Sequence, residues 1–164
     1  MKLPEITEHQ IWTAEECAQV AMIVRGLRAY WINRGRFYTL GAATYQDSAH
    51  SYTGIANCTN ILLAEKFYKT AAFDVLQQKL EKIYGARVIA LEDFAYPGFH
   101  VFDHLANGQI GSLHFDEPYT HLQLPDGWSN PTSFTIAIQM PEAGAGLNYW
   151  STDTIPLNHE YDGE

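Results

Sequence analysis

The stretch Ser112-Leu113-His114-Phe115-Asp116 places a histidine and an aspartate two positions apart. Successive side chains of a β-strand point to opposite faces, so His114 and Asp116 would share one face while Leu113 and Phe115 share the other. One face then suits a core, and the other presents an imidazole nitrogen beside a carboxylate, a donor pair that suits a divalent metal ion. A hydrogen-bonded pair on a half-exposed strand is the alternative for so short a pattern.

The segments around this stretch also alternate between apolar and polar residues. Alternation of this kind predicts half-buried strands, here over 88–94, 99–102, 133–140 and 147–150. Tyr96-Pro97-Gly98 predicts a turn or bulge between the first two. Small and polar residues on the second face of 133–140, Gln139 among them, suggest an interior with room for a ligand, which His100 or His104 could also face.

The residues before Gly85 have helical patterns. Thr13 and Glu16 form the sequence signature of a capping box, which predicts a helix from there to about Arg28. A short strand is predicted over 37–40, a polar loop over 46–57, and a second helical stretch over 61–84, broken near Thr70. The order indicates one α+β domain over 1–164, with helical support over 1–85 and strands over 86–164.

Composition and charge exclude some functions. The chain has 164 residues, 46% of them hydrophobic, with a net charge of −9, and residues 88–164 hold eleven acidic residues but no Lys or Arg. Nucleic-acid affinity depends largely on Lys and Arg, so we expect no nucleic-acid partner. No apolar run is long enough to cross a membrane. Cys17 and Cys58 fit no CxxC spacing, so we expect reduced thiols in a cytoplasmic protein.

The chain resembles the Fe(II)/2-oxoglutarate-dependent oxygenases, especially their prolyl-hydroxylase-like branch, over roughly residues 13 to 164. The resemblance rests on the order of five motifs, which are Leu91-Glu92, Tyr96-Pro97-Gly98, His114-Phe115-Asp116, Thr135-Ile136-Ala137-Ile138 and Gly146-Leu147-Asn148-Tyr149-Trp150. It implies N-terminal helices packed on a jelly roll, a double-stranded β-helix. It also implies an Fe(II) ion held by two histidines and one carboxylate, with 2-oxoglutarate and O2 as cosubstrates.

The resemblance assigns roles to four residues. His114 and Asp116 would bind the iron. Tyr96 matches a family tyrosine before Pro-Gly that reaches the cosubstrate, and Gln139 matches a residue that contacts the 2-oxoglutarate carboxylate; a buried glutamine bonded only to backbone is the alternative. Related halogenases replace the carboxylate by Ala or Gly, so Asp116 implies hydroxylation of a small-molecule, amino-acid or peptidyl substrate.

The sequence also departs from the family pattern. The family takes its second histidine from a later strand, followed by an Arg or Lys that pairs with 2-oxoglutarate, but the last basic residue here is Arg87. A buried dianion needs a compensating charge. One explanation is that the last strands and both missing residues lie beyond Glu164, which would leave unpaired strand edges prone to self-association. The others are that His159 is the ligand, or that the site is degenerate.

Two other functions stay open at this point. A cupin-like metal-dependent enzyme without 2-oxoglutarate would explain the missing basic residue. A jelly-roll binding module without catalytic activity would explain a degenerate metal site. Metal binding, and its response to 2-oxoglutarate, separates the three hypotheses.

Overall fold

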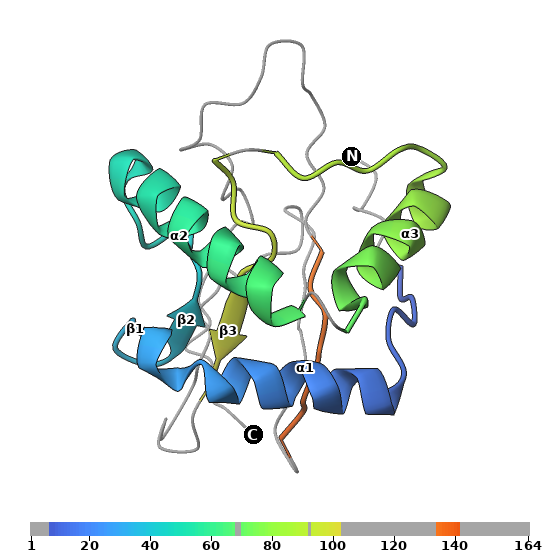
Figure 1. Ribbon diagram of the computed structural model, residues 1–164, viewed down its shortest axis with the longest axis horizontal. Helices are drawn as coiled ribbons and strands as arrows, with labels where there is room; N and C mark the ends of the chain where they lie inside the picture. Colours follow the sequence, from blue (N-terminus) through green and yellow to red (C-terminus); the bar gives the residue numbers. More distant parts are fainter. Residues whose placement is uncertain (1–6, 68–69, 92, 103–133, 142–164) are drawn as a thin grey trace, which may run out of the picture.

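The computed structural model describes residues 7–67, 70–91, 93–102 and 134–141. Its elements in chain order are α1 (Ala14–Gly26), the 3-10 helix η1 (Arg28–Tyr30), β1 (Ile32–Asn33), β2 (Tyr38–Leu40), α2 (Ala49–Phe67), α3 (Ala72–Tyr84) and β3 (Phe99–Val101). The described part is therefore α+β, with three α-helices and one small antiparallel sheet (Figure 1). The predicted α+β class is confirmed at this level.

The three strands form an antiparallel sheet in the order β1-β2-β3, so β2 lies in the middle. Thr39 of β2 pairs with His100 of β3, and Leu40 pairs with Phe99. Because side chains alternate along a strand, Leu40 and Phe99 lie on one face and Thr39 and His100 on the other. We call the first the helix face. The second, which also carries Arg34, Phe37 and Phe102 by the same alternation, is the polar–aromatic face.

All three helices bury apolar side chains against the helix face. Phe67 of α2 stacks on Phe99 of β3, with ring centroids 6.0 Å apart and planes 9° apart. Figure 1 shows α1 and α2 in front of the sheet. The buried core consists of Trp12, Val20, Val24, Leu27, Leu40, Leu63, Phe67, Ala72, Leu76, Leu80 and Phe99.

The predicted first helix is confirmed, including its cap. The Glu16 amide donates to Thr13 Oγ1 at 3.2 Å, and the Thr13 amide donates to Glu16 Oε2 at 2.7 Å, which completes the capping box. The preceding Trp12 is buried, and its Nε1 donates to the Ala72 carbonyl at the start of α3 at 3.2 Å. This contact ties the entry of α1 to α3.

The predicted polar loop over 46–57 is wrong, because α2 begins at Ala49. Ser48 precedes this helix, and its Oγ accepts a hydrogen bond from the Ser51 amide at 3.3 Å, which satisfies one of the free N–H groups of the first turn. The buried residues of α2 recur at helical spacing and are Tyr52, Ala56, Thr59, Leu63 and Phe67. The many polar residues between 46 and 57 made this helical spacing hard to recognise in the sequence. The predicted break near Thr70 is confirmed by the separation of α2 from α3.

The strands predicted over 37–40 and 99–102 are confirmed as β2 and β3, whereas those over 88–94 and 133–140 are wrong for the residues that the structure describes. The backbone of Val88 forms hydrogen bonds with side chains of α3 and not with a neighbouring strand. Gln77 Nε2 donates to its carbonyl at 2.9 Å, and its amide donates to Glu81 Oε1 at 3.2 Å. Ile136 and Ile138 are half-buried against the helix core.

Gly85 ends α3 as predicted, and it makes a stability test possible. Its backbone is left-handed, with φ 61° and ψ 25°, and an added Cβ would meet no atom within 4 Å. Gly85→Ala should therefore lower the free energy of unfolding by about 1 kcal/mol through backbone strain alone. Gly26→Ala, in α1 with equally open space, should leave it unchanged or raise it by up to about 1 kcal/mol. Urea denaturation measures both; equal effects would contradict the argument.

Candidate functional site

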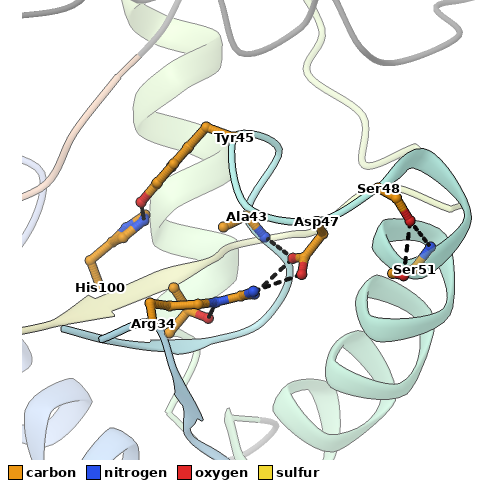
Figure 2. Close-up of polar contacts among 8 residues, drawn as sticks. Arg34, Ala43, Tyr45, Asp47, Ser48, Ser51 and His100 are labelled. Atoms are coloured by element: carbon orange, nitrogen blue, oxygen red, sulfur yellow. Dashed lines mark hydrogen bonds and ion pairs between the residues drawn. The ribbon is translucent and has the colours of Figure 1, made fainter. Parts of the chain in front are cut away.

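A buried ion pair lies on the polar–aromatic face. Arg34 donates from Nη1 and Nη2 to the two oxygens of Asp47, at 2.7 Å each, and the two side chains are 8% and 6% exposed. The Arg34 Nε donates to Thr39 Oγ1 at 3.0 Å, and Asp47 Oδ2 also accepts from the Ala43 amide at 2.8 Å (Figure 2). The pair therefore has the bidentate geometry and the additional bonds that a buried ion pair requires.

Asp47 is charged at neutral pH in this setting. Burial raises the pKa of its carboxyl, but hydrogen bonds from Arg34 and Ala43 and the charge of Arg34 outweigh burial, so the pKa lies below its ordinary value. The guanidinium and the carboxylate thus form a pair with no net charge.

An aromatic cluster lies on the same face, and we define it as Phe37, Tyr45, His100 and Phe102. Tyr45 Oη and His100 Nε2 form a hydrogen bond of 2.5 Å, and their rings stack with centroids 5.8 Å apart and planes 13° apart (Figure 2). The centroid of Phe37 lies 5.6 Å from that of Phe102, 5.7 Å from that of His100 and 6.3 Å from that of Tyr45. Phe37 therefore links the other three rings.

The polar members of the cluster are both neutral near pH 7. Partial burial lowers the pKa of His100, and the charge of Arg34 lowers it further. Partial burial raises the pKa of Tyr45, while Arg34 and Asp47 act on it in opposite directions. A phenol and a neutral imidazole can exchange donor and acceptor roles, so the pair can receive or give one hydrogen bond to a ligand.

Helix α2 fixes the segment that leads into β3. Asn60 Nδ2 donates to the Phe94 carbonyl at 2.6 Å, and Asn60 Oδ1 accepts from the Tyr96 amide at 3.0 Å. The Ala95 amide donates to the hydroxyl of Tyr52 at 3.1 Å. These bonds fix the backbone that leads into β3, whose second residue is His100.

The Pro97-Gly98 turn lies against the end of β2. A Cβ added to Gly41 would stand 3.4 Å from Gly98 Cα, and one added to Gly98 would stand 3.3 Å from the Ala42 carbonyl oxygen. Gly41 has a φ of 109°, which a side chain would strain as well. Glycine at both positions lets the loop that carries Tyr45 approach the turn before β3.

The structure describes two of the residues with predicted site roles. Tyr96 is half-buried, follows the segment held by Asn60, and has its ring 5.7 Å from that of Phe73 of α3. Burial raises the pKa of its phenol, and the charges of Asp74 and Glu81 raise it further. Its predicted contact with a cosubstrate stays a prediction.

Gln139 is exposed, and its Oε1 accepts from Arg25 Nη2 of α1 at 2.5 Å, which ties residues 134–141 to that helix. Its role toward 2-oxoglutarate also stays a prediction. His114, Asp116 and His159 lie outside the described residues. Within the described ranges, no group of three or more His, Cys, Asp or Glu side chains could hold a metal ion.

Sequence patterns did not indicate the ion pair or Tyr45. Arg34 and Asp47 lie in segments with no shared motif, and only the pairing of β1 with β2 brings them together. His100 had a usable signal, because it alternates with the buried Phe99 along a correctly predicted strand. The same alternation, extended to Phe37 and Phe102, predicts the face that they share.

Comparisons of this chain with protein-family models, with curated proteins and with solved structures find no match. None of the helices that the structure describes is long and apolar enough to cross a membrane. Cys17 and Cys58 are both free thiols.

Proposed function

We propose that this protein is an Fe(II)/2-oxoglutarate-dependent oxygenase that hydroxylates a small-molecule, amino-acid or peptidyl substrate in the cytoplasm. The observation that carries the proposal is the pair His114 and Asp116, two positions apart in an alternating stretch of sequence, at its place in the order of motifs. The free thiols of Cys17 and Cys58 agree with a reducing compartment.

The proposed fold is a jelly roll with its strands in residues 86–164, of which β3 is the strand that the described residues contain. Two features support it. The helices cover one face of an antiparallel sheet, as supporting helices would, and the opposite face carries polar and aromatic side chains rather than a second apolar layer. In a jelly roll, a face of that kind would line the interior.

The donor chemistry of His114 and Asp116 fits Fe(II), which proteins commonly hold with two histidines and one carboxylate while positions stay open. His159 is the candidate third ligand within this sequence. When bound, the iron would supply activation of O2, so that the substrate gains a hydroxyl group while 2-oxoglutarate becomes succinate and CO2. Asp116 would offset part of the metal charge.

The resemblance of its motif assigns Tyr96 to the cosubstrate, which it would contact through its hydroxyl. Since its pKa is raised by burial and by Asp74 and Glu81, the phenol keeps its proton at neutral pH and can donate a hydrogen bond to a carboxylate. Gln139 would contribute an amide donor to the same ligand. Both assignments rest on the resemblance of their motifs.

Titration with Mn(II), a redox-stable substitute for Fe(II), tests the proposal by electron paramagnetic resonance. We expect one bound ion per chain. We also expect 2-oxoglutarate to change the visible absorption of the anaerobic Fe(II) protein, because the keto acid would enter the open positions. Succinate formation measures the reaction itself.

The same titration distinguishes the alternatives. A bound metal whose absorption ignores 2-oxoglutarate would favour a cupin-like enzyme, an alternative supported by the lack of Lys and Arg after Arg87. Failure to bind either metal would contradict the proposal and favour a binding module.

A further inference from the structure

One side of α2 carries a line of exposed side chains that faces away from the helix core. Side chains three and four residues apart are neighbours on a helix surface, so this line runs through Ser51, Gly54, Cys58, Ile61 and Glu65. All five residues are exposed, whereas the buried residues of α2 lie on its other side. We call this line the outer stripe.

Two members of the outer stripe are not explained by the folding of a single chain. Ile61 is 73% exposed, the largest fraction among the exposed large hydrophobic side chains of the described residues. Gly54 lies inside the helix, where glycine is less favourable than alanine. Its backbone is not left-handed, and an added Cβ would meet no atom within 4 Å, so nothing in the same described chain requires glycine there.

The charges of α2 suit a neighbouring helix that runs in the opposite direction. Its first turn contains no acidic residue, and Glu65 lies near its C-terminal end, where Lys66 at 3.0 Å offsets part of the charge. A carboxylate is favourable beside the N-terminus of a helix and unfavourable beside the C-terminus, because of the helix dipole. In an antiparallel pair of α2 helices, Glu65 of each copy would lie beside the first turn of the other.

We propose that two copies of this chain pair through their outer stripes, with the α2 helices antiparallel and a twofold axis beside Cys58. Reversal maps the stripe onto itself, so that Ser51 lies opposite Glu65 of the second copy and Gly54 lies opposite Ile61. The isoleucine side chain then fills the open space beside the glycine, which also lets the two backbones approach closely. The symmetry makes this contact twice.

A second copy fits the outer stripe because the small residue and the large residue that match each other lie on the same stripe. A single pair of helices buries little surface compared with a stable interface, so the dimer is weak and forms at high protein concentration. The pairing uses neither a strand edge nor His114 and Asp116, so it does not depend on the proposed function.

Sedimentation velocity of the 164-residue chain, in reducing buffer at increasing protein concentration, measures the association. Ile61→Gln should weaken dimerisation by at least roughly 100-fold, because each dimer loses the burial of two isoleucine side chains. Gly54→Gln should do the same by occupying the space that the isoleucine fills. Both substitutions lie at exposed helix positions and should keep the far-UV circular dichroism of the wild type. Ile89→Gln, at an isoleucine that is 53% exposed outside the stripe, is the matched control and should dimerise normally.

Cross-linking tests the orientation of the two helices. A short bismaleimide should join Cys58 of one copy to Cys58 of the other, because the twofold axis brings these exposed thiols together. Cys58→Ser combined with Gln78→Cys moves the exposed thiol to α3 and should give no cross-linked dimer.

Three results would overturn the proposal. The first is a chain that stays monomeric at every concentration. The second is association that survives both glutamine substitutions, which would place the contact elsewhere, such as at strand edges. The third is equal cross-linking through thiols at positions 58 and 78.

Discussion

Asp47→Ala is expected to lower the free energy of unfolding by about 3–5 kcal/mol, the range for removing one partner of a buried ion pair. The substitution would leave the Arg34 guanidinium, whose side chain is 8% exposed, without its two carboxylate acceptors. It would also remove the acceptor of the Ala43 amide. Urea denaturation followed by circular dichroism measures the change.

Two comparisons control this prediction. The double substitution Arg34→Met with Asp47→Leu should recover much of the lost stability, because no buried charge is left unpaired. Glu65→Ala removes the exposed pair with Lys66, whose side chains are 69% and 45% exposed, and should cost at most about 1 kcal/mol. An Asp47→Ala cost no larger than that of Glu65→Ala would refute the role given to the buried pair.

The pH dependence of stability follows from the same pair. Because the fold lowers the pKa of Asp47 from its ordinary 3.8, the ion pair contributes its full stability above that pH. The contribution is lost as the pH falls through the lower pKa of the folded state. Glu16, whose pKa is lowered by its backbone and side-chain hydrogen bonds with Thr13, titrates in the same direction. The loss of unfolding free energy on acidification should therefore be smaller, but not zero, in the double variant Arg34→Met with Asp47→Leu.

His114→Ala or Asp116→Ala should abolish metal binding by the 164-residue chain. Each substitution removes a donor atom that contacts the metal in the proposed site, so the loss of Mn(II) affinity should exceed the roughly 10–100-fold that loss of an outer-shell partner costs. Far-UV circular dichroism should stay near that of the wild type, since the helix core lies elsewhere in the sequence.

His50→Ala and Glu65→Ala are suitable controls. Both residues are exposed on α2, and the substitutions remove one imidazole and one carboxylate, respectively. They should bind Mn(II) as the wild type does. Wild-type affinity in either His114→Ala or Asp116→Ala would mean that the metal site lies elsewhere. His159→Ala then decides whether that histidine completes the ligand set.

The sequence predicted well those elements whose determinants are local. The capping box of Thr13 and Glu16 identified α1, and Gly85 marked the end of α3. The helical stretch predicted from residue 61 covers the end of α2, but the first part of this helix was missed because Ser48, Ser51 and Gly54 were interpreted as loop residues. Its buried stripe is visible only when Tyr52 and Ala56 are counted with the residues that follow. In the prediction, a few polar residues therefore counted for more than the helical spacing of the apolar residues.

Alternation misled the strand predictions in two places for a physical reason. Alternation in the sequence indicates that every second side chain is buried, but it does not indicate which groups form hydrogen bonds with the backbone. Side chains of α3 bind the Val88 backbone, and Ile136 is half-buried against the helix core without a strand ladder. The contact between Arg34 and Asp47 depends on the pairing of β1 with β2, so no local sequence pattern predicts it.

The pairing of β2 with β3 also constrains how this protein can change during evolution. The register of this pairing puts Phe99 into the core and His100 on the opposite face of the sheet. Inserting or deleting one residue just before β3 would exchange the side chains of the two faces and damage the packing on both, whereas a change of two residues would preserve them. The close approach of Gly41 and Gly98 leaves little room even for that. Replacing side chains on one face is therefore compatible with this pairing, whereas changing the length of the chain by one residue is not.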